Sequence, residues 1–167
     1  MSSRTRMSPV TLWLTIIGAM VLMIVPLPDL LEAWRPPFVT MAIIYWAMMW
    51  PRICGTLTAF IAGLMLDLFC GSMLGEHALA LTVVAYLTVR FHLQIRIFPL
   101  WQLTFTAFML MAIDTFLVFW ADGIAGYPGG GIARWTQVIA GGVAWAPTMA
   151  LLDNLRLRAE NRSKKFA

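Results

Sequence analysis

The sequence predicts an all-α integral membrane protein, a six-helix transmembrane bundle with both termini in the cytoplasm. Hydrophobic residues make up 60% of the 167 residues and charged residues 12%, whereas a soluble domain carries roughly 25% charged residues. The apolar residues form six blocks of about the length at which a helix crosses the hydrocarbon layer. These blocks are apolar on every side, and a transmembrane barrel would instead show alternation with a period of two.

We expect the six helices at 9–27, 36–50, 53–70, 76–90, 99–121 and 134–153, followed by a basic cytoplasmic tail at 154–167. Ser8 and Pro9 suit the N-cap and first position of the first helix. That helix is retained rather than cleaved as a signal peptide, because no small-residue cleavage site follows it. The second and fourth helices are short, so they either cross a thinned bilayer, borrow flanking residues or lie inside the bundle.

The two later helices carry their own signals. The fifth contains the carboxylate Asp114 in its outer half. In the sixth, Gly141 and Gly142 favour close packing, and Pro147 favours a kink.

The basic residues predict the orientation. With a cytoplasmic N-terminus and six crossings, only Arg35 and Arg134 face outward, as the positive-inside rule requires. The net charge of +4 therefore reports membrane orientation and not nucleic-acid binding. The ten inward-facing residues are Arg4, Arg6, Arg52, Arg90, Arg96, Arg156, Arg158, Arg162, Lys164 and Lys165.

Tryptophans mark the expected membrane surfaces. Trp46 and Trp50 end the second helix on the inner side, and Trp101 begins the fifth there. Trp120 closes the fifth helix on the outer side. Since tryptophan favours the headgroup level, we interpret all four as interfacial anchors.

Catalytic signatures are missing from the sequence. It contains no Walker A loop, GxSxG, HExxH or metal-ligand cluster. Its histidines, His77 and His92, are expected on opposite sides of the membrane. We therefore expect a protein that is not an enzyme and has no cofactor.

The third helix carries a stripe of small residues. Gly55, Ala59, Gly63 and Asp67 recur at intervals of four, a spacing that lets another helix approach closely. Asp67 ends this stripe, so we expect it to point into a helix contact. A carboxylate in hydrocarbon is costly unless it is paired or protonated.

Ionisable groups gather near one mouth of the next hairpin. Gly71 and Gly75 bracket a short turn, and Glu76 and His77 open the fourth helix. Asp67 is expected either to face Asp114 or to share Glu76 and His77 with it. Two roles stay open for these carboxylates, a hydrogen bond that joins helices and a site for a transported ion or substrate.

The ordered motifs resemble the rod shape-determining protein MreD family from Pro26 to about Leu152. Relatives often have a second glutamine where Leu103 stands, and a Trp-Pro pair where Ala146 separates Trp145 from Pro147. The motifs that carry the resemblance are Pro26–Asp29, Arg35-Pro36, Tyr45-Trp46, Pro51, Gly63, Leu66-Asp67-Leu68, Gly71-Ser72, Leu74-Gly75, Ala85-Tyr86, Leu100-Trp101-Gln102, Asp114, Phe119-Trp120, Trp145 and Pro147.

The resemblance implies a role in bacterial cell elongation at the inner (cytoplasmic) membrane. Family members partner the bitopic protein MreC and connect the actin-like MreB to the glycan polymerase RodA and its transpeptidase. The implied fold is similar to the substrate-binding membrane subunit of energy-coupling-factor transporters, which keeps a carrier function open. The candidate helix-packing or partner-binding residues are Gly55, Ala59, Gly63, Asp67, Gly71, Gly75, Trp101, Gln102 and Asp114.

A scaffold and a carrier make different demands on the sequence. A carrier needs several polar groups around a cavity at mid-depth. Here the ionisable groups crowd the outer third, and the inner half of the expected bundle is nearly all apolar. This distribution favours a scaffold that binds membrane proteins and lipid in the bilayer plane, with the carrier as the alternative.

Overall fold

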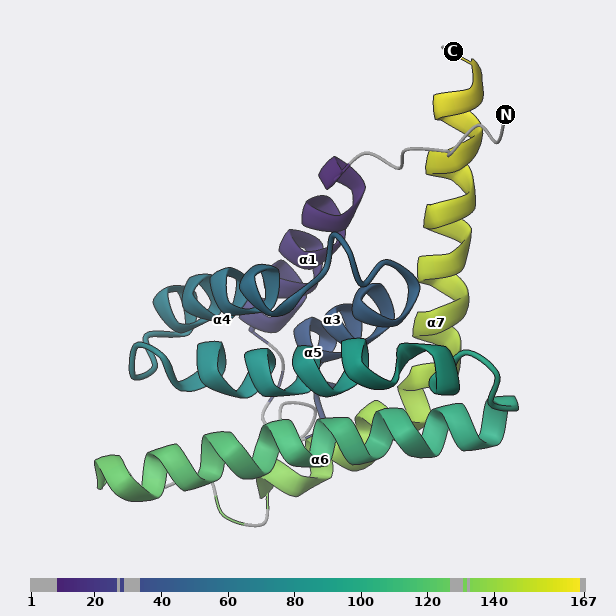
Figure 1. Ribbon diagram of the computed structural model, residues 1–167. Helices are drawn as coiled ribbons and strands as arrows, with labels where there is room; N and C mark the ends of the chain where they lie inside the picture. Colours follow the sequence, from purple (N-terminus) through teal and green to yellow (C-terminus); the bar gives the residue numbers. More distant parts are fainter. Residues whose placement is uncertain (1–8, 27, 29–33, 127–130, 132, 166–167) are drawn as a thin grey trace.

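The structure, a computed structural model, describes residues 9–26, 28, 34–126, 131 and 133–165, with only the backbone described at 133 and 161–165. The chain forms helices joined by turns in these ranges. No strand occurs in these ranges, which confirms the predicted all-α class (Figure 1). The six helices of the described chain are α1 (Pro9–Ile24), α3 (Phe38–Met49), α4 (Thr56–Cys70), α5 (Glu76–Ile95), α6 (Leu100–Ala125) and α7 (Ala133–Lys165).

Three helices run further than the sequence predicts. α5 and α6 continue to Ile95 and Ala125. α7 continues to Lys165, so the expected tail after residue 153 is helical in its described part. The segment NLRLRAENRSKK has no glycine or proline and is rich in strong helix formers, which explains this continuation.

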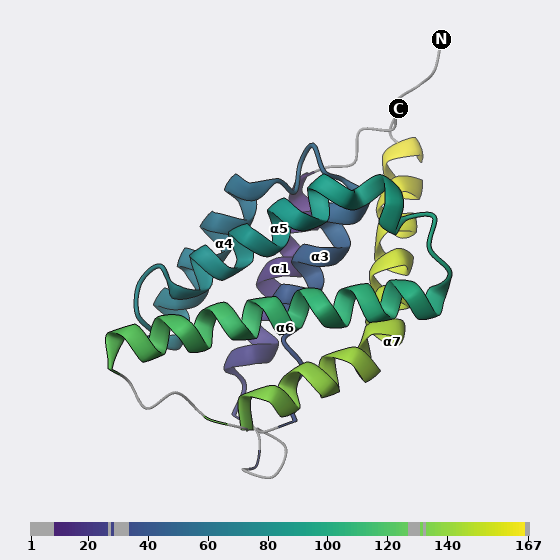
Figure 2. The same ribbon diagram turned by 60° about the horizontal axis from the view of Figure 1, so that its bottom comes forward.

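α7 changes direction along its length, as Figures 1 and 2 both show. Pro147 lies inside the helix, where its ring removes a backbone hydrogen bond and favours a bend. Before the bend, α7 packs closely on α6, because a Cβ on Gly142 would lie 3.0 Å from the ring of Phe108.

α3 forms the centre of the bundle. All ten residues from Val39 to Met48 are buried, and the helix contacts α1, α5, α6 and α7. The short second helix of the prediction therefore lies inside the bundle, with a length of about 18 Å at 1.5 Å per residue.

The interfacial role predicted for Trp46 is wrong. Its side chain is 1% exposed, and its indole N–H donates to the hydroxyl of Thr15 on α1 at 2.7 Å. Trp101 and Trp120 are exposed, at 74% and 58%, as expected for side chains that reach a headgroup layer.

The helix ends gather on two sides of the bundle. The α5–α6 turn lies at the right of Figures 1 and 2, on the same side as the last turns of α7. The α4–α5 turn and the end of α6 lie at the opposite end. Near that end, the Arg35 guanidinium donates to the carbonyls of Met23 and Val25, which satisfies free acceptors where α1 ends.

Three helices in the described chain are long and apolar enough to cross a membrane, and α1, α3 and α4 are shorter apolar helices. Large hydrophobic side chains are exposed on five helices, in contrast to the buried α3. An exposed apolar surface of this extent is typical of a membrane or protein interface. Examples are Leu14, Leu57, Leu93, Ile124 and Val143.

Candidate functional site

The centre of the candidate site is the hairpin of α4 and α5. A Cβ on Gly63 would lie only 2.3 Å from the Cα of Ala78 and 2.7 Å from the carbonyl oxygen of His77. The two backbones therefore touch at Gly63, and Ala59 one turn away is fully buried. This is the close approach that the small-residue spacing predicts.

Asp67 closes the mouth of this hairpin. Its side chain is buried, and its carboxylate accepts hydrogen bonds from the backbone N–H of Gly75 at 2.8 Å and of His77 at 3.1 Å. The Ser72 hydroxyl donates to the same group at 2.9 Å. A carboxylate at this position satisfies the free N–H groups of α5 and complements its positive dipole end. Asp67 thus caps a helix to which it does not belong.

The turn between the helices depends on two glycines. Gly71 has φ 65° and Gly75 has φ 103°, both in the left-handed region that glycine adopts without a steric penalty. Gly71 and Ser72 donate their N–H groups to the carbonyl of Asp67, which ends α4. The chain then returns at once, which brings Gly75 and His77 to the Asp67 carboxylate.

His77 links the two carboxylates singled out by the sequence. Its Nδ1 lies 2.8 Å from Oδ1 of Asp67, and it also interacts electrostatically with Asp114 on α6. No hydrogen bond joins Asp67 to Asp114 in the described chain. Of the two expected arrangements, the second is met only in part: His77 interacts with both carboxylates, whereas Glu76 interacts with His77, Asp122 and Arg134.

Asp114 is buried between helices. The Thr40 hydroxyl on α3 donates to its Oδ2 at 2.9 Å. Its Oδ1 is also buried and has no hydrogen-bond partner within the described residues. The group therefore has an unused acceptor in the interior of the bundle, which normally costs about 1–3 kcal/mol.

A second ionic cluster joins three helices at the same end. Arg134 at the start of α7 pairs with Asp122 near the end of α6, with Nη1 to Oδ2 at 2.6 Å. Glu76, the buried first residue of α5, interacts electrostatically with both. The sequence places these groups at one mouth but does not predict that they pair.

The opposite end holds a polar contact that sequence reasoning missed. Tyr45 on α3 donates its hydroxyl to Oδ1 of Asp153 on α7 at 2.5 Å, and Arg156 pairs with the same carboxylate at 3.4 Å. The i,i+3 spacing of Asp153 and Arg156 was an available signal for their ion pair, though not for the contact with Tyr45. The expectation of a nearly apolar inner half is therefore wrong at this contact.

The other predicted site residues lie away from these clusters. Gly55 is the N-cap residue of α4, and a Cβ there would come no closer than 3.8 Å, to the carbonyl of Pro51. Trp101 is exposed, and the carbonyl of Gln102 accepts a bond from Thr106 in the same helix. No group of three potential metal ligands is found in the described residues.

Comparison with known proteins gives a consistent picture. The family model described as rod shape-determining protein MreD matches residues 3–146. The chain is 30% identical over 111 residues to "Rod shape-determining protein MreD" of Haemophilus influenzae, a match that covers 64% of this chain and 68% of that protein. No solved structure matches the chain.

Proposed function

This chain belongs to the rod shape-determining protein MreD family, and on that premise we propose that it is a non-catalytic subunit of the bacterial cell-elongation complex. It binds an MreC-type bitopic protein in the inner membrane. Through that partner it helps to couple MreB filaments to RodA and its transpeptidase, and so to lateral peptidoglycan synthesis. The family match over residues 3–146 carries this proposal.

The way in which the bundle uses its polar groups supports a binding role. Both carboxylate oxygens of Asp67 accept bonds from α5 and its turn, and Asp153 ties α7 to Tyr45. These contacts fix the helices relative to one another. The exposed apolar faces of α1, α4, α5, α6 and α7 then offer a rigid surface on which a partner's transmembrane helix packs.

Six crossings with both termini in the cytoplasm suit this function. The even number of described helices and the excess of arginine and lysine on one side support this topology. Membrane-impermeant maleimide, applied to intact cells, tests it with single-cysteine variants. Gly129→Cys should be labelled from outside, whereas Arg96→Cys and Lys164→Cys should be labelled only after the membrane is opened. External labelling of Lys164→Cys would overturn the six-crossing topology.

The function itself is tested in rod-shaped cells that lack their own MreD. Expression of this chain should restore rod shape, and MreC should co-purify with it after gentle detergent extraction. A chain that restores shape but never retains MreC would contradict the proposed partner.

A carrier or substrate-binding transporter subunit is the second candidate function. The buried, unpartnered Oδ1 of Asp114 favours it, because a donor group on a ligand would satisfy that oxygen. A fold like that of the energy-coupling-factor subunits would suit this role. Loss of rod shape in Asp114→Asn, with normal protein level and normal MreC capture, would support the carrier over the scaffold.

A further inference from the structure

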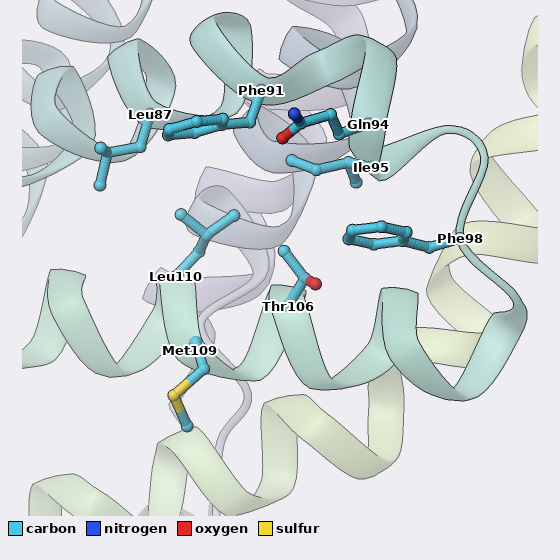
Figure 3. Close-up of a pocket in the computed structure, with 8 residues that line it drawn as sticks. All are labelled: Leu87, Phe91, Gln94, Ile95, Phe98, Thr106, Met109 and Leu110. Carbon is cyan, nitrogen blue, oxygen red and sulfur yellow. The ribbon is translucent and has the colours of Figure 1, made fainter.

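A groove lies between the second half of α5 and the first half of α6. Its volume is about 280 Å³, close to the lower end of roughly 300 Å³ for small-ligand pockets. Figure 3 shows side chains from the two helices approaching it from opposite sides. The lining residues are Leu87, Phe91, Gln94, Ile95 and Phe98 from α5 and its turn, and Thr106, Met109 and Leu110 from α6.

The walls of the groove are almost entirely hydrocarbon. Thr106 commits its hydroxyl to the carbonyl of Gln102, which leaves the amide of Gln94 as the polar group at the rim. A transmembrane helix is about 10 Å wide, too wide to enter a groove of this volume. A flexible alkyl chain is narrow enough and meets only apolar walls.

Positive charge stands at the same end of the hairpin. Arg90 is three residues after Leu87 and four before Gln94, so it neighbours both on the surface of α5. Arg96 caps the helix immediately beyond Ile95 with helical backbone angles, so it projects from the face of α5 opposite the groove. Both arginines are exposed, and neither forms an ion pair with another described residue. The unpaired guanidinium of Arg90 beside an apolar groove complements a molecule with an anionic head and a long alkyl chain.

We propose that this groove binds one acyl chain of an anionic phospholipid, with the lipid phosphate held by Arg90. The assignment concerns α5 and α6 alone and does not depend on the proposed partner protein. Gln94 at the rim donates to the phosphate or to a glycerol ester oxygen.

Native mass spectrometry of the full chain in detergent tests the site with two lipids of identical chains, dioleoyl phosphatidylglycerol and dioleoyl phosphatidylcholine. The wild type should retain the anionic lipid preferentially. Arg90→Gln should weaken that retention by roughly fivefold. Arg96→Gln, which removes an exposed arginine from the opposite face of the same helix, should leave the preference unchanged.

A second pair of variants tests the groove itself. Thr106→Phe fills it and should lower retention of both lipids, whereas Thr104→Phe, two residues away and outside the lining, should not. Circular dichroism and monodisperse size-exclusion profiles establish that each variant is folded. Equal retention of the two lipids by the wild type would overturn the proposal. Unchanged lipid retention in Thr106→Phe would also overturn it. So would a poly-leucine transmembrane peptide that displaces the two lipids from the groove equally well.

Discussion

Asp67 and His77 meet twice, because both the backbone N–H and the ring Nδ1 of His77 lie within hydrogen-bond distance of the same carboxylate oxygen, at 3.1 and 2.8 Å. Asp67 ends the small-residue face of α4, and His77 lies in the first turn of α5. The pair therefore holds the hairpin closed at its mouth, one turn from the backbone contact at Gly63. A helix contact and a helix cap depend here on the same side chain.

Asp67→Asn should destabilise the protein by about 1–3 kcal/mol. Each carboxylate oxygen accepts a backbone N–H, so either orientation of the amide places its NH₂ against a donor. Asp114→Asn is the matched control, because Thr40 uses only Oδ2 and the NH₂ can take the unpartnered position. Asp114→Asn should lower the stability by less than half as much, as measured by thermal unfolding of the detergent-solubilised protein. Equal losses would show that Asp67 does not act as a cap.

Gly63→Ala should lower the unfolding free energy by about 1–3 kcal/mol, as overpacking does. The added methyl would overlap the backbone of Ala78, which cannot rotate away as a side chain can. Gly18→Ala is the control, since nothing lies within 4 Å of a Cβ there and alanine favours a helix interior. Urea unfolding of both variants distinguishes them. A Gly63 variant as stable as the Gly18 variant would place this face away from α5.

Tyr45→Phe should cost about 1 kcal/mol, because Asp153 loses the hydroxyl donor that joins α3 to α7. Tyr86→Phe makes the same chemical change on an exposed position of α5 and should leave the thermal midpoint unchanged. The comparison is informative because both variants delete one hydroxyl. A loss of similar size in both would mean that the Tyr45 contact adds nothing to stability.

Cys54 should resist alkylation in the folded protein. It lies in the turn between α3 and α4 with no exposed surface, and burial raises the pKa of its thiol to about 12. The raised pKa keeps the thiol protonated, so an increase from pH 7 to pH 9 should not start its reaction with maleimide. Mass spectrometry of the Cys70→Ser variant checks this, with the protein unfolded in detergent as the reactive control. Modification of folded Cys54 at the rate of the unfolded chain would contradict its burial.

Sequence reasoning predicts the helices well and their burial poorly, for a physical reason. Long apolar blocks specify helices in hydrocarbon, because every backbone group must be satisfied within the segment. The same blocks are apolar on all sides, so they do not distinguish a lipid-facing helix from a buried one. Trp46 illustrates this limit, since its neighbour in space is Thr15 on α1. Only the packing of four helices around α3 shows that it is a core residue.

The candidate site is predictable in part. The spacing of Gly63 and Asp67 predicts a close helix contact, and Gly71 and Gly75 predict a tight turn. The capping role of Asp67 depends on the left-handed backbone at Gly75, which turns the start of α5 toward the carboxylate. The contact of Tyr45 with Asp153 spans 108 positions, and no local pattern in the sequence encodes such a pairing.

The burial of α3 has a consequence for biogenesis. This helix leaves the ribosome early, yet α5, α6 and α7, which cover it, are synthesised later. The translocon therefore holds or releases α3 before the helices that pack against it have been made. The packing around α3 is complete only after the last helix is inserted. We expect a chain truncated before Arg134 to be degraded faster than the full chain in a pulse–chase experiment, since quality-control proteases would meet Tyr45 uncovered. Similar lifetimes for the two chains would mean that the earlier helices assemble without α7.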